Sequence, residues 1–190
     1  MKKNLVLIFL AMVLTVTAGV CESRTDAAYY YDYAWGWLYN GLRGDKDVCE
    51  SSAFNYAMVQ CAVDEGKDPF QTTGYTFMDL DGDGRMEMII GQTENRWETP
   101  FLFEIWTHGP SGPVSVLQGW DRNRLYLTYD GNGANYGLYQ EGAESAFESI
   151  RRKGRLRGGR VTWENVSAYN AQSLSLYLPA LIPFSEGLCY

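Results

Sequence analysis

The sequence is poor in histidine and in closely spaced cysteines. Its 190 residues include one histidine, His108, and four scattered cysteines, whereas a structural zinc site needs paired ligands at short spacing. The net charge is −7, which disfavours general nucleic-acid binding. The longest apolar run, residues 5–14, is too short for a membrane-spanning helix, which needs about 20 apolar residues. The sequence therefore predicts an acidic globular protein with neither a structural zinc site nor a general nucleic-acid-binding surface.

The start of the chain has the layout of an export signal. Two lysines precede the apolar run, and small residues follow it up to Ala18. A positive start, a short apolar stretch and a small residue before the cleavage point are typical of a secretory signal peptide. We therefore predict a signal peptide over residues 1–18 and a single mature domain over residues 19–190, located outside the cytoplasm.

Cys21 offers a second route to the same compartment. A bacterial lipoprotein is cut directly before a cysteine that receives lipid, and small residues precede that cysteine. Ala18 and Gly19 are small, but Val20 stands where glycine or alanine is usual. Plain secretion and lipid anchoring at Cys21 both remain open, and both are extracytoplasmic.

Export also permits disulfides. Cys49 and Cys61 lie in what reads as one helix, about 18 Å apart at the helical rise, whereas a disulfide joins Cα atoms within about 7 Å. If they are oxidised, each must therefore pair with Cys21 or Cys189. The alternative is a pair of buried free thiols on an apolar helix face.

Residues from about 25 to 66 predict a helical hairpin. An apolar stripe at helical spacing marks the first helix, and it consists of Tyr31, Trp35, Leu38 and Leu42. Gly41 and Gly44 end this helix. Asp47 and Glu50 resemble a capping box for a second helix, which Gly66 ends. The aromatic residues between 29 and 39 either pack against the sheet or stack on sugars, and we interpret them as core.

From residue 75 onward the pattern changes to short strands with tight turns. We expect strands at residues 75–78, 86–90, 101–107, 114–117, 125–129, 136–139, 146–151 and 161–166. Strands at this spacing predict an antiparallel sheet, and helices followed by strands predict the α+β class. The pattern of residues 168–190 is ambiguous.

The acidic run at residues 79–87 carries the clearest chemistry. Calcium takes six to eight oxygen ligands, mostly from carboxylates and backbone carbonyls. Alternating aspartates can point inward around an ion where glycine permits a sharp turn, and without a cation they would repel one another. We predict calcium ligands at Asp79, Asp81, Asp83, the carbonyl of Arg85, and Glu87. The alternative is a solvated turn.

This loop is not an EF-hand, because Ile90 stands at the twelfth position, where an EF-hand has glutamate. The loop resembles the calcium loop of β-type modules such as FG-GAP repeats. Residues 74–91 resemble a group of exported proteins and lipoproteins of Gram-positive, often gut, bacteria, and weaker similarity extends over residues 45–153. The resemblance implies a helical region, a calcium loop and a following sheet, and it implies no particular activity.

A second charged segment is basic. Six cations fall between residues 151 and 160, namely Arg151, Arg152, Lys153, Arg155, Arg157 and Arg160. The glycines among them, Gly154, Gly158 and Gly159, predict the turn of a hairpin. One interpretation is contact with an anionic surface such as wall polymer, phospholipid or glycan. The other is a solvated turn or an internal partner for acidic groups.

No spacing selects a catalytic pair of carboxylates, although Glu104, Asp121 and Glu141 are candidates for a glycosidase. His108 follows a strand and precedes glycines and prolines, so we expect a solvated loop residue. The sequence favours an exported, non-enzymatic, calcium-binding module at or near a bacterial cell surface, with calcium as a structural ion. The alternatives are a carbohydrate-binding module that uses exposed tryptophan and tyrosine, and a cell-envelope hydrolase.

Overall fold

The computed structural model describes residues 28–30, 35–96, 98–129, 136–143 and 149–187. The predicted signal peptide, Cys21 and Cys189 therefore lie outside the described residues. Within these ranges, none of the helices has the length and apolar character needed to cross a membrane.

The helical region consists of short segments. They are α2 (Gly36–Leu42), α3 (Lys46–Cys49), α4 (Ala57–Glu65) and α5 (Pro69–Thr72). The first predicted helix ends at Arg43 and Gly44, and Gly44 has a φ of 84°. The left-handed Gly66 ends α4, as predicted.

The prediction of one continuous helix from Asp47 to Gly66 is wrong. Asp45, rather than Asp47, caps α3 by accepting hydrogen bonds from the amides of Asp47 and Val48. The chain then leaves the helix, because two side chains form hydrogen bonds with nearby backbone amides. The Ser51 hydroxyl accepts from the Ala53 amide, and the side-chain oxygen Oδ1 of Asn55 accepts from the Ala57 amide. Such local bonds compete with helix formation.

Because that helix is interrupted, the helical distance argument for Cys49 and Cys61 no longer applies. Both are free thiols in the described structure, and the Cys49 thiol donates a hydrogen bond to the Gly41 carbonyl at 3.4 Å. The predicted pairing with Cys21 or Cys189 falls outside the described residues.

Ten strands follow, and each described strand pairing is antiparallel. They are β1 (Thr73–Met78), β2 (Glu87–Gln92), β3 (Leu102–Gly109), β4 (Gly112–Gln118), β5 (Asn123–Tyr129), β6 (Tyr136–Ala143), β7 (Ser149–Arg157), β8 (Arg160–Asn165), β9 (Leu176–Tyr177) and β10 (Ile182–Pro183). The sheet order is β10-β1-β2-β3-β5-β6-β7-β8, with β4 on β3 and β9 on β5. Short helices before a mainly antiparallel sheet confirm the α+β prediction.

The end of the chain, whose pattern was ambiguous, adds small pieces to the sheet. The helix α6 (Ala168–Gln172) precedes β9, and the 3₁₀ turn η2 (Phe184–Glu186) follows β10. Phe184 is buried and stacks on Trp35, with ring centroids 4.7 Å apart. Phe184 therefore anchors the end of the described chain in the core.

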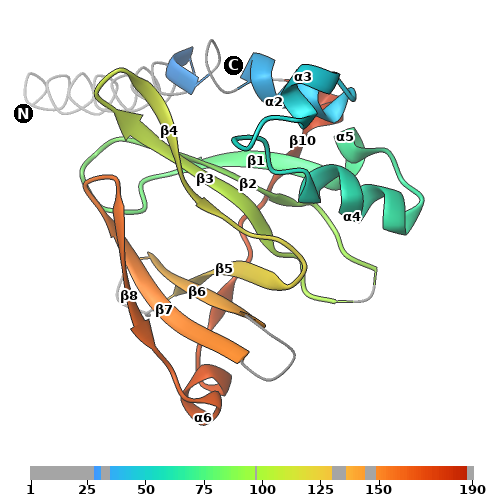
Figure 1. Cartoon of the computed structure of the whole chain (residues 1–190). Coiled ribbons are helices and arrows are strands. Elements are labelled where there is room, and N and C mark those ends of the chain that lie inside the picture. The colour runs from blue at the N-terminus through green and yellow to red at the C-terminus, as the bar shows by residue number, and fades with distance from the viewer. Residues whose placement is uncertain (1–27, 31–34, 97, 130–135, 144–148, 188–190) are drawn as a thin grey trace, which may run out of the picture.

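The helices α2–α5 lie over the β1–β3 half of the sheet, while β5–β8 form the other half below it, with α6 at its far end (Figure 1). One core lies under the helices, where the Tyr30 hydroxyl donates to the Trp106 carbonyl at 3.3 Å. A second core joins the two halves through side chains that include Ile89, Ile105, Leu127, Leu138 and Leu156. Tyr31 lies outside the described residues, but the described aromatic residues Tyr30 and Trp35 pack as core.

His108 does not occupy a solvated loop, as the sequence predicted. It lies on β3, and its ring stacks on Tyr29 with centroids 4.2 Å apart. The strand extends to Gly109 because β4 pairs with it up to Gly112, so the turn at the glycines and prolines begins later than expected.

Glu104 is a fully buried carboxylate beneath the helical region. Its oxygens accept hydrogen bonds from the Trp106 indole and, at 3.4 Å, from the Gln118 amide. Burial raises the pKa of the Glu104 carboxyl from 4.5 to about 8, because removal from water disfavours the charged form more than these bonds favour it.

This shift predicts a pH-dependent stability. The folded protein holds the Glu104 proton more tightly than the unfolded chain, so the stabilisation is complete below about pH 4.5 and is lost as pH rises towards 8. Over that range the free energy of unfolding should fall by up to about 1.4 kcal/mol per pH unit. Glu104→Gln removes the titrating group, and urea unfolding at several pH values should show the flatter profile. Parallel profiles for the two proteins would contradict the prediction.

Candidate metal centre

The acidic loop connects β1 to β2. The last residue of β1, Met78, pairs with the first residue of β2, Glu87, so the hairpin brings the two ends of the loop together. Gly82 and Gly84 have φ values of 77° and 86°, which residues with side chains rarely adopt. They let the intervening chain curl back on itself.

Three of the predicted ligands meet inside this curl. Asp79, Asp81 and Glu87 each offer a carboxylate oxygen, and these oxygens lie within 4.8 Å of one another. The two aspartates are half-buried, and Glu87 is 1% exposed. This acidic group could hold a metal ion.

The other two predicted ligands are not part of this group. The Asp83 carboxylate accepts a hydrogen bond from the Arg85 amide at 2.8 Å, and Asp83 lies outside the three-carboxylate group. Ligation by Asp83 and by the Arg85 carbonyl stays a prediction.

Backbone amides hold the aspartates in place. The two oxygens of Asp79 accept from the amides of Gly82 at 2.7 Å and Gly84 at 3.1 Å. One oxygen of Asp81 accepts from the Asp83 amide at 3.2 Å. The loop therefore points its acids inward through its own backbone.

Glu87 is fixed from two sides. One oxygen accepts from the Leu80 amide at 2.8 Å, and the other accepts from the Thr107 hydroxyl on β3 at 2.9 Å. Burial, with smaller contributions from the charges of Asp81 and Asp83, raises the pKa of the Glu87 carboxyl to about 7. A cation between these acids would offset both the burial and the repulsion.

A distant turn completes the surroundings of the loop. The second oxygen of Asp81 accepts from the Gly158 amide at 2.9 Å, 77 positions further along the chain. Gly158 and Gly159 form the turn between β7 and β8, and Gly159 also approaches Thr107. The β7–β8 turn therefore closes against the acidic loop, a contact that no sequence pattern indicated.

The basic segment consists of the end of β7, a turn and the first residue of β8. The predicted hairpin turn is confirmed at Gly158 and Gly159, whereas its extension to Gly154 is wrong. Only Gly158 and Gly159 turn, with φ values of 54° and 72°. Gly154 lies within β7, where a side chain would collide with the ring of Trp163. Glycine is needed there because Trp163 covers the strand.

The pleat of β7 divides the basic residues between two faces. Alternate residues point to opposite sides, so one face presents Arg151, Lys153, Arg155 and Arg157. Arg152 points the other way, where its guanidinium donates to Gln140 at 2.8 Å and lies 4.5 Å from the Trp163 ring. Lys153 also pairs with Glu164 at 3.4 Å.

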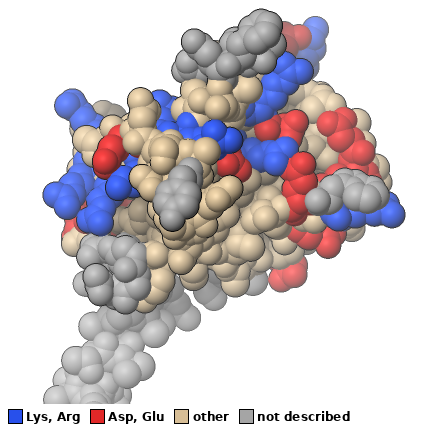
Figure 2. Space-filling model, turned by 90° about the horizontal axis from the view of Figure 1, so that it is seen from below, with Lys and Arg blue, Asp and Glu red and all other residues tan. Residues whose placement is uncertain are grey.

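Charge is unevenly distributed over the surface. Figure 2 shows lysine and arginine gathered on the side that carries β7 and β8, and many of the acidic side chains on the opposite side. Within the basic segment, the exposed cations are Lys153, Arg155, Arg157 and Arg160.

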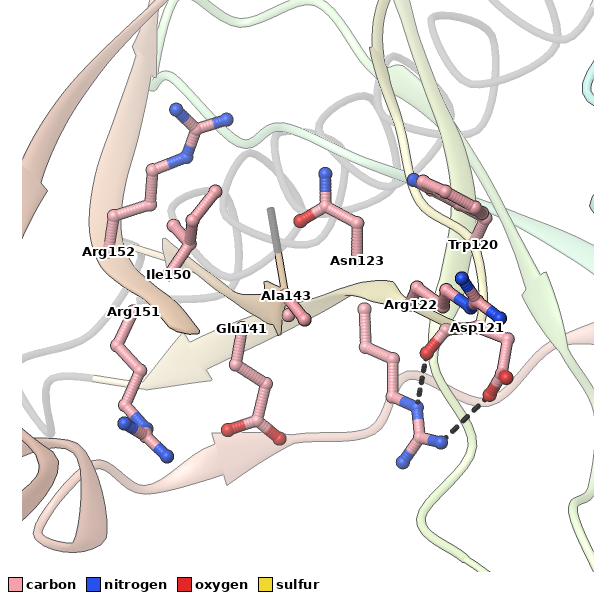
Figure 3. Close-up of a pocket in the computed structure, with 11 residues that line it drawn as sticks. Trp120, Asp121, Arg122, Asn123, Glu141, Ala143, Ile150, Arg151 and Arg152 are labelled. Atoms are coloured by element: carbon pink, nitrogen blue, oxygen red, sulfur yellow. Dashed lines mark hydrogen bonds and ion pairs between the residues drawn. The ribbon is translucent and has the colours of Figure 1, made fainter. Parts of the chain in front are cut away.

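The structure brings together two of the three glycosidase candidates and separates the third. Glu104 is buried, whereas Asp121 and Glu141 line one open cleft of about 910 Å³ (Figure 3). Asp121 is bonded to Arg124 at 2.8 Å, and Glu141 accepts from the Tyr139 hydroxyl at 2.8 Å. Each of the two carboxylates therefore has a local partner.

The support of Glu87 can be tested without metal. Thr107→Val removes a hydroxyl that satisfies a buried carboxylate, and it should lower the free energy of unfolding in chelator by about 1–3 kcal/mol. Thr162→Val, at an exposed position of β8, is the matched control and should change stability by less than about 0.5 kcal/mol. Equal effects of the two substitutions in urea unfolding would show that the Thr107 bond contributes nothing.

Comparison with known proteins adds no further constraint. No protein-family model, no curated protein and no solved structure matches this chain.

Proposed function

We propose that this protein is an exported, non-enzymatic module that binds calcium as a structural ion at or near a bacterial cell surface. The proposal rests on the cluster of three carboxylates formed by Asp79, Asp81 and Glu87. Carboxylate oxygens suit hard cations, and calcium tolerates an irregular, partly exposed set of oxygens better than magnesium, which demands a tight octahedron and retains water.

The proposed ion would act as a cross-link. Asp79 belongs to the β1–β2 loop, Glu87 begins β2 beneath Thr107, and Asp81 also contacts the β7–β8 turn. A cation bound by these carboxylates would therefore stabilise the place where the two halves of the sheet meet. The partly exposed loop leaves coordination positions to water, so we expect a dissociation constant on the order of 10⁻⁴–10⁻³ M, typical of extracellular modules.

Thermal unfolding tests the proposed ion. Calcium at tenfold excess over its dissociation constant should stabilise the protein by about 1.4 kcal/mol, or roughly 3–6 °C in melting temperature. Asp81→Asn should abolish this shift, because it removes a charged ligand while keeping an oxygen that can accept from Gly158. Calorimetry should show the loss of binding directly.

Asp47→Asn is the matched control, since Asp47 is an exposed aspartate outside the loop. It should retain the full calcium shift. Equal melting temperatures of the unaltered protein in millimolar calcium and in chelator would reduce the loop to a solvated turn. An equal or larger response to magnesium would reject calcium as the ion.

The outer face of β7 supports contact with an anionic wall polymer. Alternate positions lie roughly 7 Å apart along a strand, so Lys153, Arg155 and Arg157 form a row of positive charges. Such a row can follow a chain of repeated phosphates, and it lies on the side of the molecule where lysine and arginine gather (Figure 2). The surrounding negative charge would limit attachment to this face.

Retention on polyphosphate-coated beads tests this contact. The double variant Arg155→Ser/Arg157→Ser should bind roughly 30-fold more weakly at low salt, given about 1 kcal/mol for each cation near an anionic surface. The double variant Arg43→Ser/Lys46→Ser removes the same charge from the helical region and should elute with the unaltered protein. Identical elution of all three would leave β7 with a structural role only.

A further inference from the structure

A second cleft, of about 850 Å³, lies between α4 and the turn that joins β4 to β5. Two aromatic side chains line it without being covered: Tyr56 is 50% exposed and Trp120 is 49% exposed. Most aromatic rings of the described structure pack against one another in the core. Two large rings left open to the same cleft therefore stand out from the rest of the fold.

One buried side chain sets the relative position of these two rings. The Asn55 amide donates to the Gly119 carbonyl and to the Phe103 carbonyl, both at 2.8 Å. Tyr56 follows Asn55 and Trp120 follows Gly119, so this side chain fixes the two aromatic-bearing segments to each other and to β3.

The turn that carries Trp120 is itself rigid. Trp120 and Asn123 exchange backbone hydrogen bonds at 3.2 and 2.8 Å. Arg124 donates to the carbonyl and the carboxylate of Asp121, as the dashed lines in Figure 3 show, and it also pairs with Glu98. Gly119 lies so close to β3 that a side chain there would meet the Leu102 carbonyl. An exposed ring on such a turn loses little freedom on binding.

The remaining lining combines apolar and polar groups. Phe101 and Ala57 line the cleft, as do the side-chain amides of Gln60, Asn95 and Gln118. These amides both donate and accept hydrogen bonds. Two stacking faces with surrounding amides are suited to a ligand that has apolar C–H faces and a rim of hydroxyls.

The charge of the cleft restricts the ligand further. Its carboxylates include Asp64, Glu65 and Asp121. Burial raises the pKa of the Cys61 thiol to about 11, with smaller contributions from the charges of these three carboxylates. The lining holds four carboxylates, with Glu98 as the fourth, against the two cations Arg122 and Arg124, so its charge is negative on balance. A polyanion is therefore disfavoured here, in contrast to the outer face of β7.

We propose that this cleft binds a neutral oligosaccharide between Tyr56 and Trp120. The rings stack on the C–H faces of the sugar, whose hydrogens meet the negative face of the π system, and the amides and carboxylates bind its hydroxyls. A cleft of about 850 Å³ lies within the usual range for small-ligand sites. The site is separate from the acidic loop and does not depend on the proposed calcium ion.

Titration of the full exported protein with cellotriose and with the trimer of N-acetylglucosamine tests the proposal, followed by tryptophan fluorescence and calorimetry. At least one of these probes should bind with a dissociation constant on the order of millimolar or tighter. Tyr56→Ala and Trp120→Ala should each weaken binding at least tenfold. Tyr129→Ala removes an exposed tyrosine from another cleft and should leave binding unchanged.

Several results would overturn the proposal: no saturable binding of either trimer up to about 10 mM, binding that survives both alanine substitutions, or displacement of the sugar signal by polyphosphate at low millimolar concentration. The Asp81→Asn variant separates this proposal from the calcium proposal. It should lose the calcium response and keep sugar binding, so either function can fail without the other.

Discussion

A buried carboxylate needs hydrogen-bond donors or a cation. The buried carboxylate of Glu87 therefore determines how the acidic loop and β3 are arranged around it. The Leu80 amide bends the loop back over one oxygen, and the Thr107 hydroxyl brings β3 to the other. The same bend draws Asp79 and Asp81 towards Glu87. The acidic group is therefore a consequence of how the hairpin satisfies one buried acid, and a cation there would relieve the repulsion that this solution creates.

The parts of the structure that follow from local patterns could be predicted from the sequence. Strand periodicity, the glycine at the end of α4 and the alternating aspartates are all local. The break after α3 was missed, because Ser51 and Asn55 divert their side chains to nearby amides where the apolar spacing still looked helical. Contacts such as Asp81 with Gly158 and Asn55 with Gly119 join residues 77 and 64 positions apart. No local pattern encodes them, and they decide both candidate sites.

The pleat of β7 and the position of this strand in the sheet together separate the charged surfaces of the molecule. Pleating places one set of cations outward on β7 and turns Arg152 inward against Trp163. The strand β7 lies on the opposite side of the molecule from α4, which borders the acidic cleft (Figure 1). The acidic loop lies where the two halves of the sheet meet. An anionic polymer, a metal ion and a sugar would therefore have distinct places on one small domain.

The contact between the β7–β8 turn and the acidic loop has a consequence for the order of assembly. Closing a segment of 77 residues costs more chain entropy than forming a hairpin, so we expect this contact to form after the β1–β2 hairpin itself. On the export that we propose, the amino-terminal part leaves first, and the acidic loop reaches the exterior before the turn that closes on it. The half-formed loop would then meet external calcium while the rest of the sheet is still being translocated. The ion would therefore order the loop during folding and also stabilise the completed fold.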